Sequence, residues 1–245
     1  MLIHGFHAVL ARLRRAPQGV RELYVDASRE DARVRDLVKV AHQAGLRPHF
    51  VDGARIAKMC PGKRHQGVVA IVDFAPPTLS LEGLLDAAVA PLTLLLLDGV
   101  TDPRNLGACL RVADGAGAQA VIAPKDHACA LTEAAIQTAS GAAESVPYIM
   151  VTNLARAMDA IRDRDIRLLG TDDSAPASLY DETLSESVAW VLGAEGRGMR
   201  RLTRERCDAL VRIPMAGTVG SLNVSVAAGV VLYETLRQRL GRTKQ

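Results

Sequence analysis

Aromatic residues and long apolar runs are scarce in this sequence. Phenylalanine, tryptophan and tyrosine make up 3% of the 245 residues, so a platform of aromatic rings for stacking nucleic-acid bases is not expected. The leucine-rich run at residues 92–97 is bounded by Pro91 and Asp98 and falls short of the roughly 18 apolar residues that a membrane helix needs. The first residues contain no basic segment followed by an apolar core, so we expect no secretion signal, no membrane partner and a cytoplasmic protein.

Cysteine and histidine residues show no spacing that is typical of metal ligands. The four cysteines, at positions 60, 109, 129 and 207, include no C-x-x-C pair, so we expect neither a structural disulfide nor a zinc site. The six histidines are equally scattered, and no metal is expected. No G-x-G-x-x-G sequence follows the strand predicted at residues 94–97, which excludes a nicotinamide-dependent dehydrogenase.

Positive charge is concentrated near the amino terminus. Residues 1–72 contain 13 Lys or Arg and 6 Asp or Glu, a balance of +7, whereas the remaining residues contain 17 and 21, a balance of −4. A basic region joined to a nearly neutral one is typical of a nucleic-acid-binding protein, because phosphate neutralisation and counterion release contribute to its affinity. The alternative interpretation is a solvated helix face, particularly at residues 29–39, where acids are interspersed with bases.

Hydrophobic periodicity predicts two α/β regions. Residues 1–72 show the patterns of two helices, at 6–15 and 31–44, and of three short strands, at 22–25, 48–51 and 68–72. A Pro-Pro pair then interrupts the pattern, and we interpret residues 73–90 as a linker. In residues 91–245 apolar runs alternate with helical patterns, which is typical of a parallel sheet covered by helices on both faces.

Three apolar runs in the second region end in polar or glycine-rich loops. These runs are residues 94–97, 188–192 and 210–213. In open α/β sheets ligands bind outside the carboxyl ends of the strands, so the sequence predicts that the three loops form one site. Two plainer interpretations remain, since Ser221 and Asn223 are also typical of helix N-caps and the glycines of simple turns.

The loop sequences resemble a known family. Asp98-Gly-Val-Thr-Asp-Pro-Arg-Asn-Leu-Gly107, Gly193-Ala-Glu-Gly196 and the segment from Ile213-Pro-Met215 to Ser221-Leu-Asn-Val-Ser225 resemble, in order, the three motifs of the SpoU or TrmH branch of the SPOUT methyltransferases. His4-Gly-Phe-His-Ala-Val9 and His65-Gln-Gly-Val-Val-Ala70 also look like the N-terminal domain of this family. The resemblance covers nearly the whole chain. It implies a small N-terminal α/β RNA-binding domain, a parallel-sheet α/β domain with a C-terminal trefoil knot, and a homodimer.

The resemblance also implies the site residues. S-adenosylmethionine is the expected cofactor, bound by Gly193, Gly196, Ile213, Met215 and Leu222. The expected catalytic residues are Asn105, Arg111, Glu195, Ser221 and Asn223. RNA contacts are expected from Arg104, Lys63, Arg64 and His65.

Two arginines of the first motif need a physical interpretation. Arg104 and Arg111 are seven residues apart, so on an ideal helix they lie within about 20° of each other and could flank one phosphate. In this family, the residue at the Arg111 position has been regarded as the group that activates the hydroxyl. A guanidinium with a pKa above about 12 is a poor base, so stabilising a developing alkoxide or holding a phosphate is the better-supported role. The plainer alternative is an ion pair with Asp102 or Asp114.

The implied activity is transfer of a methyl group from S-adenosylmethionine to a ribose 2'-hydroxyl of RNA, with guanosine in the peptidyl-transferase region of 23S rRNA as the expected target. One alternative is a tRNA ribose 2'-O-methyltransferase of the same family, which would carry a short helical extension in place of the N-terminal domain. Another alternative is an inactive RNA-binding ribosome-assembly factor, but all five expected catalytic residues are present.

Overall fold

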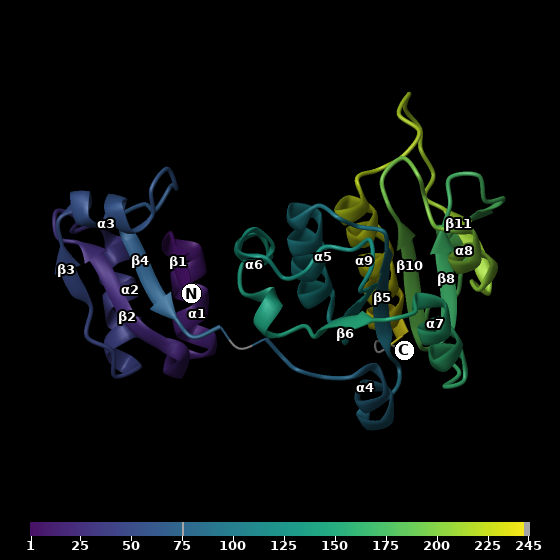
Figure 1. The fold of residues 1–245 in the computed structure, drawn as a ribbon, viewed down its shortest axis with the longest axis horizontal. Coiled ribbons are helices and arrows are strands. Elements are labelled where there is room, and N and C mark those ends of the chain that lie inside the picture. Colours follow the sequence, from purple (N-terminus) through teal and green to yellow (C-terminus); the bar gives the residue numbers. More distant parts are fainter. Residues whose placement is uncertain (75, 243–245) are drawn as a thin grey trace. The chain divides into compact units, whose positions relative to one another are not determined.

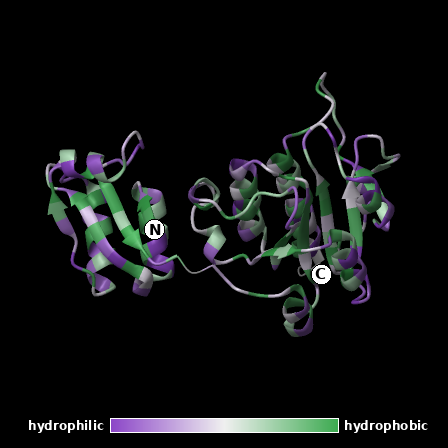
Figure 2. Ribbon diagram, viewed as in Figure 1, coloured by the Kyte–Doolittle hydropathy of each residue, from purple (hydrophilic) through white to green (hydrophobic). Residues whose placement is uncertain are grey.

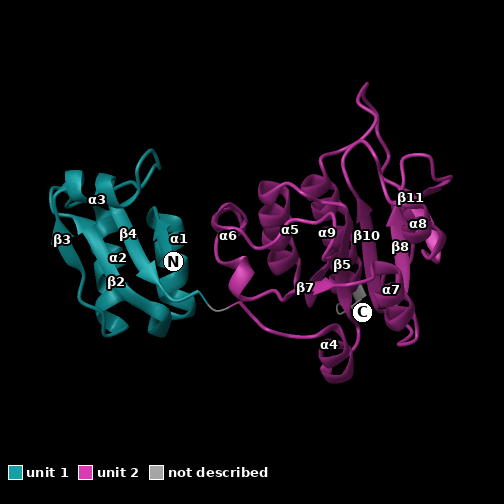
Figure 3. Ribbon diagram, viewed as in Figure 1, with its two compact units in different colours: residues 1–75 teal, residues 76–245 magenta. Residues whose placement is uncertain are grey.

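The computed structural model of the chain describes residues 1–74 and 76–242. It divides into two compact units, Met1–Ala75 and Pro76–Gln245 (Figure 3). Each unit has its own sheet and its own hydrophobic core.

Unit 1 is a four-stranded mixed sheet between helices. Its elements are β1 (Leu2–His4), α1 (Phe6–Arg15), η1 (Pro17–Gly19), β2 (Val20–Asp26), α2 (Ala32–Gln43), β3 (His49–Val51), α3 (Gly53–Met59) and β4 (Val68–Val72). The strand order is β1-β4-β2-β3, in which β4 is antiparallel to β1 and β2, and β3 is parallel to β2. Helices α1 and α2 share one core with Val68, Ala70 and Val72. Helix α3 packs on the other face through Ile56 against Val69.

The sequence predicted the larger elements of unit 1 and missed the short ones. Helix α2 begins after Asp31, whose carboxylate accepts hydrogen bonds from the backbone N–H groups of Arg33 and Val34, as an N-cap does. Strand β1 and helix α3 were not predicted. Both are too short, at 3 and 7 residues, to show a clear hydrophobic period.

Unit 2 is built on a seven-stranded sheet, in which every neighbouring pair of strands is parallel. Its strands are β5 (Thr93–Asp98), β6 (Ala120–Pro124), β7 (Tyr148–Val151), β8 (Arg167–Thr171), β9 (Ala177–Ser178), β10 (Val188–Gly193) and β11 (Ala209–Arg212). Its helices are α4 (Leu81–Ala87), α5 (Pro103–Ala116), α6 (Glu133–Ala139), η2 (Ala142–Glu144), α7 (Leu154–Arg162), η3 (Leu179–Asp181), α8 (Arg201–Glu205) and α9 (Val224–Arg242). The order β7-β6-β5-β10-β8-β11-β9 places β5 beside β10 (Figure 1). The predicted parallel α/β class is confirmed.

The central strands of unit 2 consist mainly of hydrophobic residues (Figure 2), and both faces of the sheet are covered. On one face Leu94 and Leu96 of β5 pack with α4 and α7. On the other face Trp190 of β10 donates a hydrogen bond from its indole to the Thr235 hydroxyl of α9, at 2.9 Å. Successive side chains of a strand point to opposite faces, so buried strands of this kind read as continuous apolar runs.

Part of the predicted linker, residues 73–90, is instead helical. Ser80 accepts a hydrogen bond from the backbone N–H of Gly83 and begins helix α4. Leu81, Leu84 and Leu85 then lie on one side of α4 and pack in the core of unit 2. The Pro-Pro signal therefore marks the junction of the units, and the apolar spacing that follows it belongs to unit 2.

Candidate functional site

A cleft of about 430 Å³ lies at the carboxyl ends of β8, β10 and β11. Its walls are formed by the loops after these strands and by the start of α9, including Thr171, Asp172, Ser174, Gly193, Glu195, Gly196, Met199, Ile213, Met215, Ser221 and Leu222. All five residues expected to bind the cofactor line this cleft, together with Glu195 and Ser221. Its volume is within the roughly 300–1,000 Å³ range of small-molecule sites.

Three of the expected catalytic side chains form a hydrogen-bonded cluster. The amide nitrogen of Asn105, from the first turn of α5, donates to Oε1 of Glu195 at 3.1 Å. The amide nitrogen of Asn223 donates to the same carboxylate oxygen and also to the amide oxygen of Asn105, the latter at 3.0 Å. The cluster joins the first turn of α5 and the loop after β10 to the residue that precedes α9.

Asn223 combines the functional interpretation with the capping one. Its side-chain oxygen accepts hydrogen bonds from the backbone N–H and the hydroxyl of Ser225, at 2.9 and 2.5 Å, as at the start of a helix. Its nitrogen points to Glu195. One end of this amide therefore begins α9, while the other is part of the polar cluster.

A buried ion pair holds the loop that carries Glu195. The carboxylate of Asp98 is fully buried, and it accepts hydrogen bonds from the backbone N–H and the Nε of Arg200, at 2.8 and 2.7 Å. Asp98 is the last residue of β5 and lies opposite Gly193 of β10. The pair therefore holds the end of the loop at Arg200 close to its start at Gly193. The sequence analysis assigned no role to either residue, although a single acid that ends a run of buried leucines is a recognisable signal.

Gly193 lies where no side chain can be accommodated. A Cβ atom at this position would stand 2.1 Å from the backbone carbon of Gly198. Ala194 and Gly198 exchange backbone hydrogen bonds of 3.2 and 2.9 Å, and Gly196 has a φ of 74°, which favours glycine. Glu195 thus stands on a tightly closed turn.

The loop after β8 is a wall of the cleft that the sequence analysis missed. Asp172 lines the cleft and forms an ion pair of 2.6 Å with Arg204. Hydrogen bonds from the hydroxyl and backbone N–H of Ser174 lower the pKa of the Asp172 carboxyl below its ordinary value. The signal was available, since Thr171-Asp-Asp-Ser174 is a polar segment that follows the apolar residues 168–169, like the three loops that were recognised.

The arginines of α5 do not join the cluster. Both Arg104 and Arg111 are exposed, and neither lines the cleft. The Asp102 carboxylate accepts a hydrogen bond from the backbone N–H of Arg104, and the Asp114 carboxylate accepts one from the Ser145 hydroxyl.

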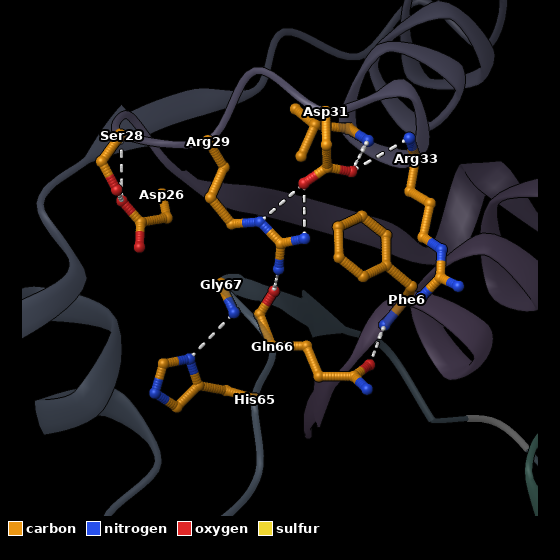
Figure 4. A network of polar contacts seen from close by, with 10 residues as sticks. Phe6, Asp26, Ser28, Arg29, Asp31, Arg33, His65, Gln66 and Gly67 are labelled. Carbon is orange, nitrogen blue, oxygen red and sulfur yellow. Dashed lines mark hydrogen bonds and ion pairs between the residues drawn. The ribbon is translucent and has the colours of Figure 1, made fainter.

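The remaining expected residues, Lys63, Arg64 and His65, lie in unit 1, in the loop between α3 and β4. Nδ1 of His65 accepts a hydrogen bond of 3.1 Å from the backbone N–H of Gly67 (Figure 4). Arg29 donates to the carbonyl oxygen of Gln66, and its guanidinium lies 4.9 Å from the centre of the Phe6 ring. The Arg29 contact links the loop to the segment between β2 and α2.

Neither a metal cluster nor a membrane helix is found in the part of the chain that the structure describes. No group of three or more histidine, cysteine or acidic side chains there could hold a metal ion. None of the helices in residues 1–74 and 76–242 is long and apolar enough to cross a membrane. Cys109 and Cys207 are free thiols, and burial raises the pKa of each to about 12.

The residues of the cleft fit S-adenosylmethionine. Met199, Ile213, Met215 and Leu222 provide an apolar wall for an adenine ring, while Asp172, Ser174 and Ser221 provide polar groups for hydroxyl and amino groups.

The fold and the cleft define an α/β protein with a ligand site at the carboxyl ends of parallel strands. Comparison with known sequences identifies its family. Residues 92–233 match the SpoU rRNA methylase family, and residues 2–78 match the family described as RNA 2'-O ribose methyltransferase substrate binding. The chain belongs to the SpoU rRNA methylase family.

Relatives are similar over their whole length. The 23S rRNA (guanosine-2'-O-)-methyltransferase RlmB of Bordetella pertussis is 54% identical over 98% of this chain and 98% of its own. The enzyme of the same name from Neisseria meningitidis is 51% identical over 97% and 95%.

Solved structures confirm the fold. An RNA 2'-O ribose methyltransferase, 28% identical, superimposes with a TM-score of 0.79 over 98% of this chain and 89% of that one. The SpoU methyltransferase AviRb from Streptomyces viridochromogenes in complex with the cofactor AdoMet is 26% identical, with a TM-score of 0.74 over 98% and 91%.

Proposed function

We propose that this protein transfers a methyl group from S-adenosylmethionine to the 2'-hydroxyl of a guanosine in 23S rRNA, in the peptidyl-transferase region. The observation that carries the proposal is the Asn105–Glu195–Asn223 cluster beside the cleft. Whole-length similarity to RlmB enzymes supports the choice of RNA, nucleotide and hydroxyl.

The cofactor supplies a methyl group that is already activated on a sulfonium, so the protein's task is to align the acceptor and assist loss of the hydroxyl proton. The ribose oxygen forms the new C–O bond as the C–S bond breaks. Glu195 accepts hydrogen bonds from both Asn105 and Asn223, and thereby fixes the orientation of two amide groups beside the cleft. Such preorganised dipoles stabilise charge as it develops in the transition state.

We assign Arg111 the role of a fixed cation, not of a base. Its guanidinium is exposed, which supports contact with an RNA phosphate or with the developing alkoxide. Arg104, on the same side of α5, would contact the neighbouring phosphate. Ser221 lines the cleft and is assigned to the reacting end of it.

We assign residues 1–72 to RNA binding and residues 91–245 to catalysis. The match of residues 2–78 to a substrate-binding family supports this division, as does the +7 balance of residues 1–72. The RNA interface is assigned to the loop between α3 and β4 of unit 1, which contains Lys63, Arg64 and His65.

We further propose a homodimer in the cytoplasm, with the segment after β11 threaded into a trefoil knot. Along α9 the side chains of Val226, Tyr233 and Leu240 are 51%, 50% and 58% exposed. Their spacing of seven places them in one stripe, and an exposed apolar stripe supports self-association. The knot is supported by the approach of the loops at 193–199 and 213–222 within one cleft.

The tRNA enzyme is the second candidate. The tRNA-modifying TrmH/SpoU enzyme of A. aeolicus matches only 66% of this chain, with a TM-score of 0.57 and 25% identity. The presence of unit 1 therefore favours rRNA.

The test is to incubate the purified protein with labelled S-adenosylmethionine and either 23S rRNA or tRNA, and then to map the methylated ribose. We expect label at the 2'-oxygen of a guanosine in 23S rRNA. Glu205→Ala, which changes an exposed acid on α8, is the control and should not alter labelling. Label in tRNA alone, or on a base, would refute the proposal.

A further inference from the structure

A groove in unit 1 is lined by residues of α2 and β3, at the edge of the smaller sheet. Its volume is about 650 Å³. Val34 and Val38 of α2 form its floor together with the ring of Phe50, which is 55% exposed. Because side chains alternate along a strand, Phe50 faces α2, whereas its neighbour His49 stacks on Tyr24 at 5.2 Å.

The rim of the groove is basic. Arg35 and Lys39 follow Val34 and Val38 directly on α2. Because they are four residues apart, they lie on the same side of the helix as each other. Neither has an acidic partner among the residues described in unit 1. Glu30 is the only acid among the groove's lining residues.

We propose that this groove binds a single-stranded segment of the RNA substrate, with one base stacked on Phe50 and the flanking phosphates at Arg35 and Lys39. The inference rests on the proposed RNA-binding role of unit 1. An aromatic face stacks on any unpaired base, and lysine and arginine neutralise phosphates.

The shape of the groove favours a nucleotide over a protein segment. Val34 is only 4% exposed, so the accessible apolar surface is mainly one planar ring. Protein interfaces generally require larger contiguous apolar patches. The low aromatic content of the chain argued against a platform of several rings, but one exposed ring is sufficient to stack one base.

Binding of the full-length protein to a short oligouridylate tests the stacking contact. Phe50→Ala should weaken binding about 5- to 150-fold, the ratio equivalent to ~1–3 kcal/mol for one stacked base. Phe50→Tyr keeps an aromatic ring and should bind like the wild type. In Phe50→Trp, RNA should quench the new fluorescence, whereas the buried Trp190 of the wild type should be unaffected.

The phosphate contact is tested by salt dependence. Lys39→Gln should lower the slope of log K against log salt by ~0.7, the value for one contact to a single strand. Lys58→Gln changes a lysine on α3, which packs on the opposite face of the sheet, and should leave the slope unchanged.

Oligouridylate affinity that is unchanged in Phe50→Ala, or the absence of quenching in Phe50→Trp, would overturn the inference. If the wild type methylates 23S rRNA normally in that case, the proposed function stands without this groove. If the wild type neither binds nor methylates rRNA, the proposed function fails and the inference fails with it.

Discussion

Removal of Arg200 should destabilise unit 2 more than removal of the acid that it contacts. In Arg200→Ala the Asp98 carboxylate, with 0% of its side chain exposed, keeps the backbone N–H of residue 200 but loses its only cation among the described residues. Breaking a buried pair in this way costs roughly 3–5 kcal/mol. Because half of the Arg200 side chain is exposed, solvent screens the pair, and we expect about 3 kcal/mol.

Asp98→Asn should cost less. It retains an acceptor for the Arg200 backbone N–H and leaves the arginine free to reach solvent, so the loss is that of one charged hydrogen bond, about 2 kcal/mol. Arg201→Ala is the matched control. Its partner Glu205 and Arg201 itself are 51% and 76% exposed, and exposed pairs contribute at most about 0.5 kcal/mol.

Urea unfolding followed by tryptophan fluorescence measures these effects in unit 2 alone, since Trp190 is the only tryptophan. With a slope of roughly 1–3 kcal/mol/M, Arg200→Ala should lower the midpoint by about 1–3 M. The loop that carries Glu195 should loosen as well, so S-adenosylmethionine affinity should fall in the same variant. A midpoint for Arg200→Ala no lower than that for Arg201→Ala would refute the reasoning.

Three further outcomes follow from the site. Asn223→Asp retains a good N-cap but replaces the donor to Glu195 with a second carboxylate, so single-turnover methyl transfer should fall at least ~100-fold; near-normal turnover would leave capping as the residue's only role. Rates for Arg111→Lys should lie between those of the wild type and Arg111→Ala from neutral to alkaline pH, because lysine keeps the charge but not the bidentate fork; a lysine variant that overtakes the wild type at high pH would indicate proton abstraction, since its reference pKa is near 10.4. A fragment of residues 76–245, which retains the leucines of α4, should bind S-adenosylmethionine but bind rRNA weakly and with a shallower salt dependence; an equal salt slope in filter binding would contradict the assigned role of unit 1.

The sequence by itself determined the local structure and the chemical inventory of the site. The leucine run of β5 followed by Asp102-Pro-Arg specifies a buried strand, an N-cap and a helix start through short-range preferences alone. The glycines around Glu195 likewise predict a tight loop. The motif order was sufficient for a correct prediction of the family and of a parallel α/β fold.

Tertiary structure alone decided which of these groups meet. Asn105 and Glu195 are 90 residues apart, and Asn105 and Asn223 are 118 apart, yet they share hydrogen bonds because β5 and β10 pair in register, with Asp98 opposite Gly193. The same pairing creates the Asp98–Arg200 contact across 102 residues. Strand order is set by the packing of helices on both faces of the sheet, and hydrophobic periodicity, which repeats within a few residues, contains no information about distant neighbours.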